Sequence, residues 1–143
     1  MNSLAPAERA FIDGHRVARL ATSDLHGAPH VIPIVYAYVD EAVYFIVDDK
    51  PKRTHSLKRL RNIEQNPQVA LLIDDYDEDW NSLAYLLIHG RADLVSDRLE
   101  FVRLLSALRA RYPQYQSMAL AFDSHALVRI AIEQAHFWRA TPP

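Results

Sequence analysis

A strongly basic segment is the first feature with chemical potential. Residues 50–62 (KPKRTHSLKRLRN) contain six of the 16 Lys and Arg in the chain and no carboxylate. From residue 54 onward the pattern predicts a helix, and a helix N-terminus carries partial positive charge and unpaired N–H groups. Cations on both sides of such a terminus suit a bound phosphate or carboxylate. A solvated helix face that only maintains solubility is an equally simple interpretation.

Seven histidines invite comparison with metal sites, but none belongs to an H-E-x-x-H pattern, so a zinc site has little support. His30 is of most interest, because its strand is expected to run close to the basic segment. The acidic stretch 74–79 lacks the glycine and terminal glutamate of a calcium-binding loop, so a polar loop is the simpler interpretation. Trp80 follows it, as a core anchor or as a wall for a flat ligand.

Several classes of function are disfavoured by composition. The chain has no cysteine, which excludes a disulfide, a thiolate metal site and a cysteine nucleophile, and it has no G-x-S-x-G turn. Its net charge of -2, with no aromatic residue inside the basic segment, argues against nucleic-acid binding. No apolar run is long enough to span a membrane and no secretory signal is evident, so a cytoplasmic protein without membrane contact is expected.

The elements that must position these residues are mostly strands, in one domain that spans residues 1–143. The first three strands are expected to form a meander, with Pro33 at an edge or a bulge and Gly90 at a later bend or bulge. A mainly β fold (β plus α) follows, with six antiparallel strands in a small barrel and helices packed on it. Helices are predicted at 6–14, 54–65 and 97–112, and strands at 16–24, 28–40, 42–49, 68–74, 82–96 and 125–140.

Three segments together resemble a known family. They are 18–38 (ARLATSDLHGAPHVIPIVYAY), 50–74 (KPKRTHSLKRLRNIEQNPQVALLID) and 74–95 (DDYDEDWNSLAYLLIHGRADLV). The small-residue strand, the G-x-P turn, the Arg-Asn-Ile…Asn-Pro stretch and the strand ending in Gly-Arg-Ala resemble the pyridoxamine 5'-phosphate oxidase-like FMN-binding split-barrel superfamily. Within it, the chain is most similar to the actinobacterial branch of deazaflavin (coenzyme F420)-dependent oxidoreductases, and the resemblance covers almost the whole chain.

The resemblance implies a six-stranded antiparallel split β-barrel with flanking helices that forms a homodimer. It places the cofactor, coenzyme F420 or alternatively FMN, in a groove at the subunit interface. The ring would lie against the second and third strands, and the phosphate would meet the basic segment. Carried onto this sequence, the cofactor contacts would be His30, Val31, Ile32, Pro33, Val47, Asp48, Lys52, Arg53, Lys58, Arg59 and Trp80, the last from the same subunit or from the partner.

In this reading the cofactor carries the chemistry, and the protein orients it against a conjugated small-molecule acceptor. The activity implied is an F420-dependent oxidoreductase that transfers hydride from the reduced deazaflavin. Two alternatives remain open: an FMN-binding oxidoreductase of the same fold, and a cofactor- or haem-binding protein without turnover. No catalytic residue is assigned, although His30 and Tyr36 are candidates to protonate the product.

Overall fold

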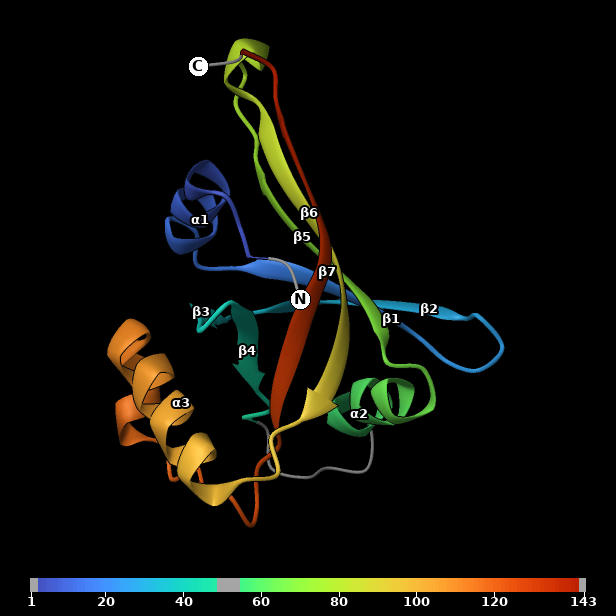
Figure 1. Ribbon diagram of the computed structural model, residues 1–143, viewed down its shortest axis with the longest axis vertical. Helices are drawn as coiled ribbons and strands as arrows, with labels where there is room; N and C mark the ends of the chain where they lie inside the picture. Colours follow the sequence, from blue (N-terminus) through green and yellow to red (C-terminus); the bar gives the residue numbers. More distant parts are fainter. Residues whose placement is uncertain (1–2, 49–54, 142–143) are drawn as a thin grey trace.

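Figure 1 shows the computed structural model of the chain, which describes residues 3–48 and 55–141. Strands dominate it, and all their pairings are antiparallel. The helices are α1 (Pro6–Asp13), α2 (His55–Gln65) and α3 (Arg98–Arg111), with short 3-10 turns η1 (Trp80–Ser82) and η2 (Pro113–Ser117). The strands are β1 (Ala18–Ser23), β2 (Pro29–Ile34), β3 (Ala37–Val39), β4 (Ala42–Ile46), β5 (Gln68–Asp75), β6 (Ala84–Leu94) and β7 (Leu127–Arg139).

A single seven-stranded sheet has the order β2-β1-β5-β6-β7-β4-β3. This confirms the mainly β, antiparallel fold with flanking helices. The count is seven strands and not six, because the strand expected at 28–40 is interrupted at Val35 and Tyr36 and becomes β2 and β3. Both hairpins of the expected three-stranded meander form, β1 with β2 and β3 with β4, but they are not neighbours in one meander, because β2 and β3 are the two opposite edges of the sheet.

The same interruption closes the sheet. Only Val35 and Tyr36 separate the end of β2 from the start of β3. Two residues span less than about 11 Å, counting the bonds on either side, so the two edges of the sheet must come close together there. A seven-stranded sheet can satisfy this only by curling, and the result is the half-barrel visible in Figure 1.

Two apolar clusters stabilise the curled sheet. One fills the barrel, where Leu20, Leu71 and Ile88 are fully buried. The other lies between α3 and the β3–β4 hairpin and includes Phe101, Leu104, Leu105 and Leu108. The sequence predicts that this helix buries a stripe of Phe101, Val102, Leu105, Leu108 and Tyr112; the stripe forms, except that Val102 is exposed and Leu104 is buried instead. Burial follows the helical period of 3.6 residues, and Val102 lies a quarter of a turn away from Phe101.

Local expectations about Pro33 and Gly90 are confirmed. Pro33 lies on β2, which is an edge strand. Proline has no N–H to donate to a neighbouring strand, and an edge strand needs this donor on one side only. The β6–β7 register shifts between His89 and Gly90, which marks a bulge. A Cβ added at Gly90 would lie 2.5 Å from the backbone oxygen of Ala131, so the close approach of β7 requires glycine.

The elements are arranged around the barrel as Figure 1 shows. The β5–β6 hairpin and the end of β7 extend upward, with η1 at the tip. The β1–β2 hairpin projects to the right, with α2 below it, and α3 covers the lower left beside β4. Among the helices in the described ranges, none is both long enough and apolar enough for a bilayer span.

Candidate functional site

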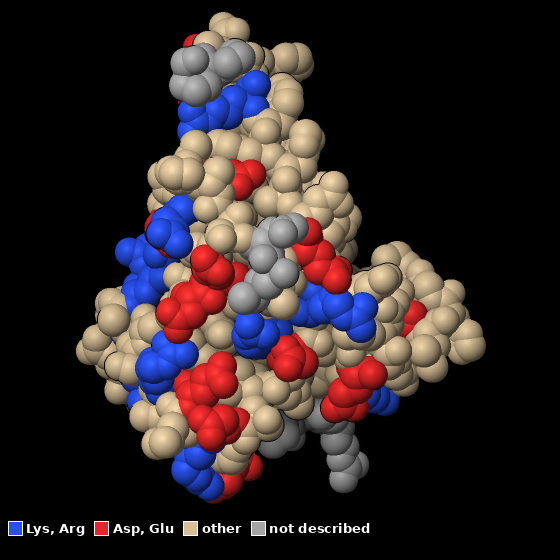
Figure 2. All heavy atoms as spheres, in the orientation of Figure 1, with Lys and Arg blue, Asp and Glu red and all other residues tan. Residues whose placement is uncertain are grey.

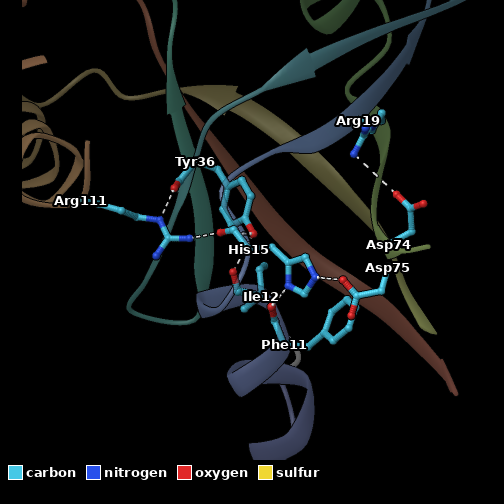
Figure 3. A network of polar contacts seen from close by, with 8 residues as sticks. All are labelled: Phe11, Ile12, His15, Arg19, Tyr36, Asp74, Asp75 and Arg111. Atoms are coloured by element: carbon cyan, nitrogen blue, oxygen red, sulfur yellow. Dashed lines mark hydrogen bonds and ion pairs between the residues drawn. The ribbon is translucent and has the colours of Figure 1, made fainter. Parts of the chain in front are cut away.

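Tyr36 fixes the point at which the chain crosses from one sheet edge to the other (Figure 3). Its side chain is fully buried, and its hydroxyl donates to the backbone oxygens of Ile12, at 2.6 Å, and His15, at 3.1 Å. Helix α1 ends here, where backbone oxygens lack partners within the helix. Burial raises the pKa of Tyr36 above its ordinary value, so its phenol remains a donor at neutral pH.

Arg111, the last residue of α3, reaches the same crossing. Its Nε donates to the backbone oxygen of Tyr36 at 3.0 Å, its Nη1 to that of Asp13 at 3.0 Å, and its Nη2 to that of His15. A cation at the carboxyl end of α1 also interacts favourably with the helix dipole. The crossing is therefore held by hydrogen bonds that join α1, α3 and the β2–β3 connection (Figure 3).

A groove with two adjoining lobes opens beside this crossing. The small lobe, about 280 Å³, lies between the ends of β2 and β4 and helix α2, and its walls include Pro33 and Arg59. The large lobe, about 570 Å³, lies against the end of α3 and η2, and its walls include Arg16 and Met118. The residues common to both lobes are Val35, Asp48 and Tyr115.

The wall between the lobes carries a hydrogen-bonded pair of acidic groups. The hydroxyl of Tyr115, a buried residue, donates to Oδ2 of Asp48 at 3.1 Å. Burial, and after it the neighbouring Asp48 carboxylate, raises the pKa of Tyr115 above its ordinary value. The phenol therefore keeps its proton at neutral pH, with that proton directed at the carboxylate.

Arg59 is the basic residue that α2 brings to the groove. Its side chain is half-buried, and its Nε atom is buried. The positive charge of Arg59 slightly offsets the rise in the pKa of Tyr115. Lys58 is exposed instead, and it lies on the side of α2 that faces Asp24 in the β1–β2 turn. Backbone N–H groups of that turn lower the pKa of Asp24 the most, and the positive charge of Lys58 adds a smaller effect in the same direction. Successive helical residues are rotated by about 100°, so the two cations leave α2 in different directions.

A buried polar contact sets the position of α2. Nδ2 of Asn62 donates to Oγ1 of Thr22 in β1 at 3.1 Å, and both side chains are buried. This contact fixes how far Arg59 reaches toward the groove. His30 pairs with Thr22 in the β1–β2 register and is half-buried, so it lies next to the α2 contact, as expected from the sequence.

The four predicted contact residues on β2 do not share one face. Ile32 packs against the barrel core, and His30 lies on the same side. Val31, which is 61% exposed, and Pro33 point to the opposite side, as the alternation of a strand requires. Of the four, Pro33 lines the groove, and the others lie along the edge strand that leads into it.

The remaining predicted contact residues fall in three places. Asp48 lines both lobes, whereas the preceding Val47 is buried in the barrel core. Trp80 is 68% exposed at η1, the tip of the long hairpin at the top of Figure 1, far from α2. Trp80 lines neither lobe of the groove in its own subunit. Lys52 and Arg53 lie outside the described residues.

Sequence reasoning missed the residues of the large lobe. Arg16, Tyr115 and Met118 line it, and none of them was expected to contribute. A weak signal exists in segment 112–115 (YPQY), where two tyrosines flank a proline that follows a helix. Tyr36, a candidate proton donor from the sequence, has its hydroxyl occupied by the backbone oxygens of α1.

Acidic and basic side chains lie interspersed on the face drawn in Figure 2. Within residues 3–48 and 55–141, no group of three or more His, Asp or Glu side chains is arranged to hold a metal ion.

Solved structures of bacterial proteins share the fold. The conserved hypothetical protein Rv2991 from Mycobacterium tuberculosis is 24% identical, with a TM-score of 0.76, and the match covers 96% of this chain and 86% of that chain. An FAD-binding protein from Mesorhizobium loti is 23% identical, with a TM-score of 0.70 and 95% of each chain covered. The haem storage protein HutZ from Vibrio cholerae is 19% identical, with a TM-score of 0.70, covering 96% of this chain and 95% of that chain.

Sequence comparison adds one family assignment. No protein of curated function matches the chain closely enough to count as a relative. The sequence model of one family, in contrast, matches residues 4–139, from the turn before α1 to the end of β7. The chain therefore belongs to the pyridoxamine 5'-phosphate oxidase family.

Proposed function

We propose that the protein is an oxidoreductase that binds coenzyme F420 in the groove and passes hydride from the reduced deazaflavin to a conjugated small-molecule acceptor. The observation that carries the proposal is the small lobe, where Arg59 of α2 lies beside the end of edge strand β2 and the Asp48–Tyr115 pair. A planar, anionic cofactor needs this combination of a cation, apolar walls and an accessible strand edge.

The residues of the groove fit such a cofactor. Val17, Ile34 and Phe45 give the small lobe apolar walls suited to a ring, and Arg59 supplies the cation for a phosphate. Binding sites for cofactors are typically concave and mostly apolar, with volumes of about 300–1,000 Å³. The combined volume of the two lobes falls in this range. Lys58, on the exposed side of α2, would meet a phosphate that extends out of the groove.

When bound, the deazaflavin supplies the hydride, as flavin-type cofactors do. The chain's own residues orient and protect the site. Pro33 and Ile34 would contact the ring of the cofactor, and Arg59 would bind its phosphate. The O–H of Tyr115 keeps a proton at the wall between the two lobes, where it is hydrogen-bonded to Asp48.

We propose a homodimer as the functional form, because the outer face of the sheet exposes several large apolar side chains beside the Arg19–Asp74 ion pair. The strand registers place Val31, Leu72 and Trp138 on this outer face, with exposures of 61%, 36% and 40%. Tyr85 stacks on Trp138 there, with ring centroids 5.6 Å apart. Large apolar side chains exposed together on one face of a sheet often mark an interaction surface. A partner subunit could also bring its own hairpin tip toward the groove.

Two other candidates have specific support. FMN presents the same phosphate and a similar planar ring, and a fold relative is described as an FAD-binding protein. A haem carrier without turnover is supported by the likeness to HutZ, described as a haem storage protein. Both would use the same groove with different demands on its polar residues.

The deciding experiment titrates the purified protein with F420, FMN and haem by isothermal titration calorimetry, since neither tryptophan lines the groove. We expect saturable F420 binding in the micromolar range and oxidation of the reduced cofactor by conjugated acceptors such as quinones or unsaturated lactones. A yellow protein with a flavin spectrum would favour FMN instead. Haem binding without F420 binding would support the carrier, and no saturable binding of F420 would remove the main proposal.

A further inference from the structure

We propose that the large lobe of the groove is the acceptor pocket, and that it takes a flat, mostly apolar molecule with one carboxylate, whose charge is met by the guanidinium of Arg16. The assignment of the lobe to the acceptor rests on the proposed function. The recognition of a monocarboxylate rests on the lining of the lobe alone. The lobe adjoins the small lobe through shared residues, so an occupant of each would lie side by side.

The walls of the large lobe suit a flat apolar body. Tyr112 and Tyr115 present aromatic rings from the end of α3 and from η2, with centroids 6.1 Å apart. Pro113, Val35 and Met118 complete the apolar lining. At about 570 Å³ the lobe is of the size that holds a single small organic molecule.

Two arginines line the lobe, but only one is available to a ligand. Arg111 uses its N–H groups on backbone oxygens of Tyr36, Asp13 and His15, and so serves the fold. Arg16 is exposed and, within the described part of the chain, donates to a single backbone oxygen, that of Arg111. Most of its donors can therefore turn to an anion, and a guanidinium binds a carboxylate through two parallel hydrogen bonds.

Asp48 fixes the direction in which such a molecule enters. Its carboxylate lies in the wall shared with the small lobe, whereas Arg16 lines the large lobe only. An anionic group is attracted to Arg16 and repelled by Asp48, so the carboxylate end points away from the small lobe. The uncharged end then lies next to the cofactor side. A second carboxylate at that end would face Asp48 in the shared wall without reaching Arg59, which lines the small lobe only, so dicarboxylates that fit the large lobe should be rejected.

The test uses the apo protein and three related probes: trans-cinnamate, the neutral trans-cinnamamide and the dianionic 4-carboxycinnamate. Affinity is measured by isothermal titration calorimetry, without any cofactor. We expect cinnamate to bind at least about tenfold more tightly than either of the others, a difference of about 1.4 kcal/mol, because only cinnamate offers Arg16 one carboxylate and Asp48 none. Equal binding of the three probes, or no binding of cinnamate, would overturn the proposal.

Two variants and a control locate the effect. Arg16→Gln should remove the preference for cinnamate over cinnamamide, and Met118→Trp should weaken both by filling the lobe. Arg91→Gln, an exposed position on β6 that lines neither lobe, should change nothing. A preference that survives Arg16→Gln, or affinity unchanged in Met118→Trp, contradicts the assignment. Circular dichroism confirms that each variant is folded.

The outcomes separate this inference from the proposed function. Cinnamate binding that depends on Arg16, in a protein that binds no F420, would leave the pocket assigned and the cofactor proposal refuted. F420 binding without any carboxylate preference would refute the inference alone.

Discussion

The hydroxyl of Tyr115 lies 3.1 Å from Oδ2 of Asp48 and donates a hydrogen bond to it. This bond connects η2, which follows α3, with the segment that follows β4, and it does so at the wall between the two lobes. The two residues are far apart in the sequence, so the groove exists only when α3 has packed on the β3–β4 hairpin. Helix packing and the shape of the site are therefore coupled.

Alkaline pH should destabilise the protein through Tyr36 and Tyr115. Burial raises the pKa of both phenols above the ordinary value of 10.0. Above about pH 10 the unfolded chain has lost these protons while the folded chain retains them, so stability is complete below that pH and falls as pH rises further. Each phenol contributes a slope of about 1.4 kcal/mol per pH unit. Urea unfolding at a series of pH values measures it.

The matched variants are Tyr36→Phe and Tyr115→Phe. Each should reduce the alkaline slope of the unfolding free energy by the contribution of one phenol, about 1.4 kcal/mol per pH unit. Their stability at neutral pH should also drop by about 1–3 kcal/mol, because a hydrogen-bond partner is left without its donor. An alkaline slope that is the same in wild type and in both variants would show that the buried phenols titrate normally.

Cofactor affinity should depend on the basic side chains of α2. Replacing Lys58 and Arg59 together by alanine removes two cations, and each charge-assisted contact contributes about 1.5–3 kcal/mol. We expect the Kd for F420 to rise at least about tenfold. Arg61→Ala, an exposed position on the same helix, is the control and should have little effect. Unchanged affinity in a folded double variant would mean that this cluster is ordinary surface.

Arg111 should be far more important for stability than a surface arginine. Arg111→Met leaves the backbone oxygens of Tyr36, Asp13 and His15 without this donor, so we expect a loss of about 2–4 kcal/mol. Arg103→Met breaks an exposed ion pair with Asp40 and should cost less than about 1 kcal/mol. Equal thermal shifts for the two variants would contradict the role given to Arg111.

A charge on the outer face of the sheet should disrupt the proposed dimer. Leu72→Glu replaces an exposed apolar side chain of the outer face, next to the Arg19–Asp74 ion pair, by a carboxylate, and burial of that carboxylate against a partner would require costly desolvation. We expect dimers for wild type and monomers for this variant in sedimentation velocity. Val102→Glu, on exposed α3, should remain dimeric. A monomeric wild type, or a dimeric Leu72→Glu, would refute the proposed interface.

The strands and helices were largely predictable because each carries a clear period and ends at a turn residue. Helix α1 begins at Pro6 and ends before Gly14, as its signals indicate. The break at Val35 and Tyr36 was missed for a physical reason. The apolar, β-branched pattern continues through it without glycine, and the chain turns there because Arg111 and the end of α1 fix Tyr36. No local signal reports such a distant contact.

The site was predictable in part. The basic segment pointed to Arg59 and the family resemblance to Pro33, and both of these residues line the groove. Helical rotation alone could have shown that Lys58 and Arg59 point in different directions. Arg16 and Tyr115 could not be found this way, because their place in the groove depends on how α3 and η2 pack against β4.

Strand β7 lies between β6 and β4, so it pairs with one neighbour that precedes it by about forty residues and with another that precedes it by about eighty-five. During synthesis on the ribosome, β4 and the groove beside it must wait until residues 127–139 emerge from the exit tunnel. Until then the β3–β4 hairpin has an exposed apolar edge. Nascent chains stalled before that point should be the ones that most need a chaperone.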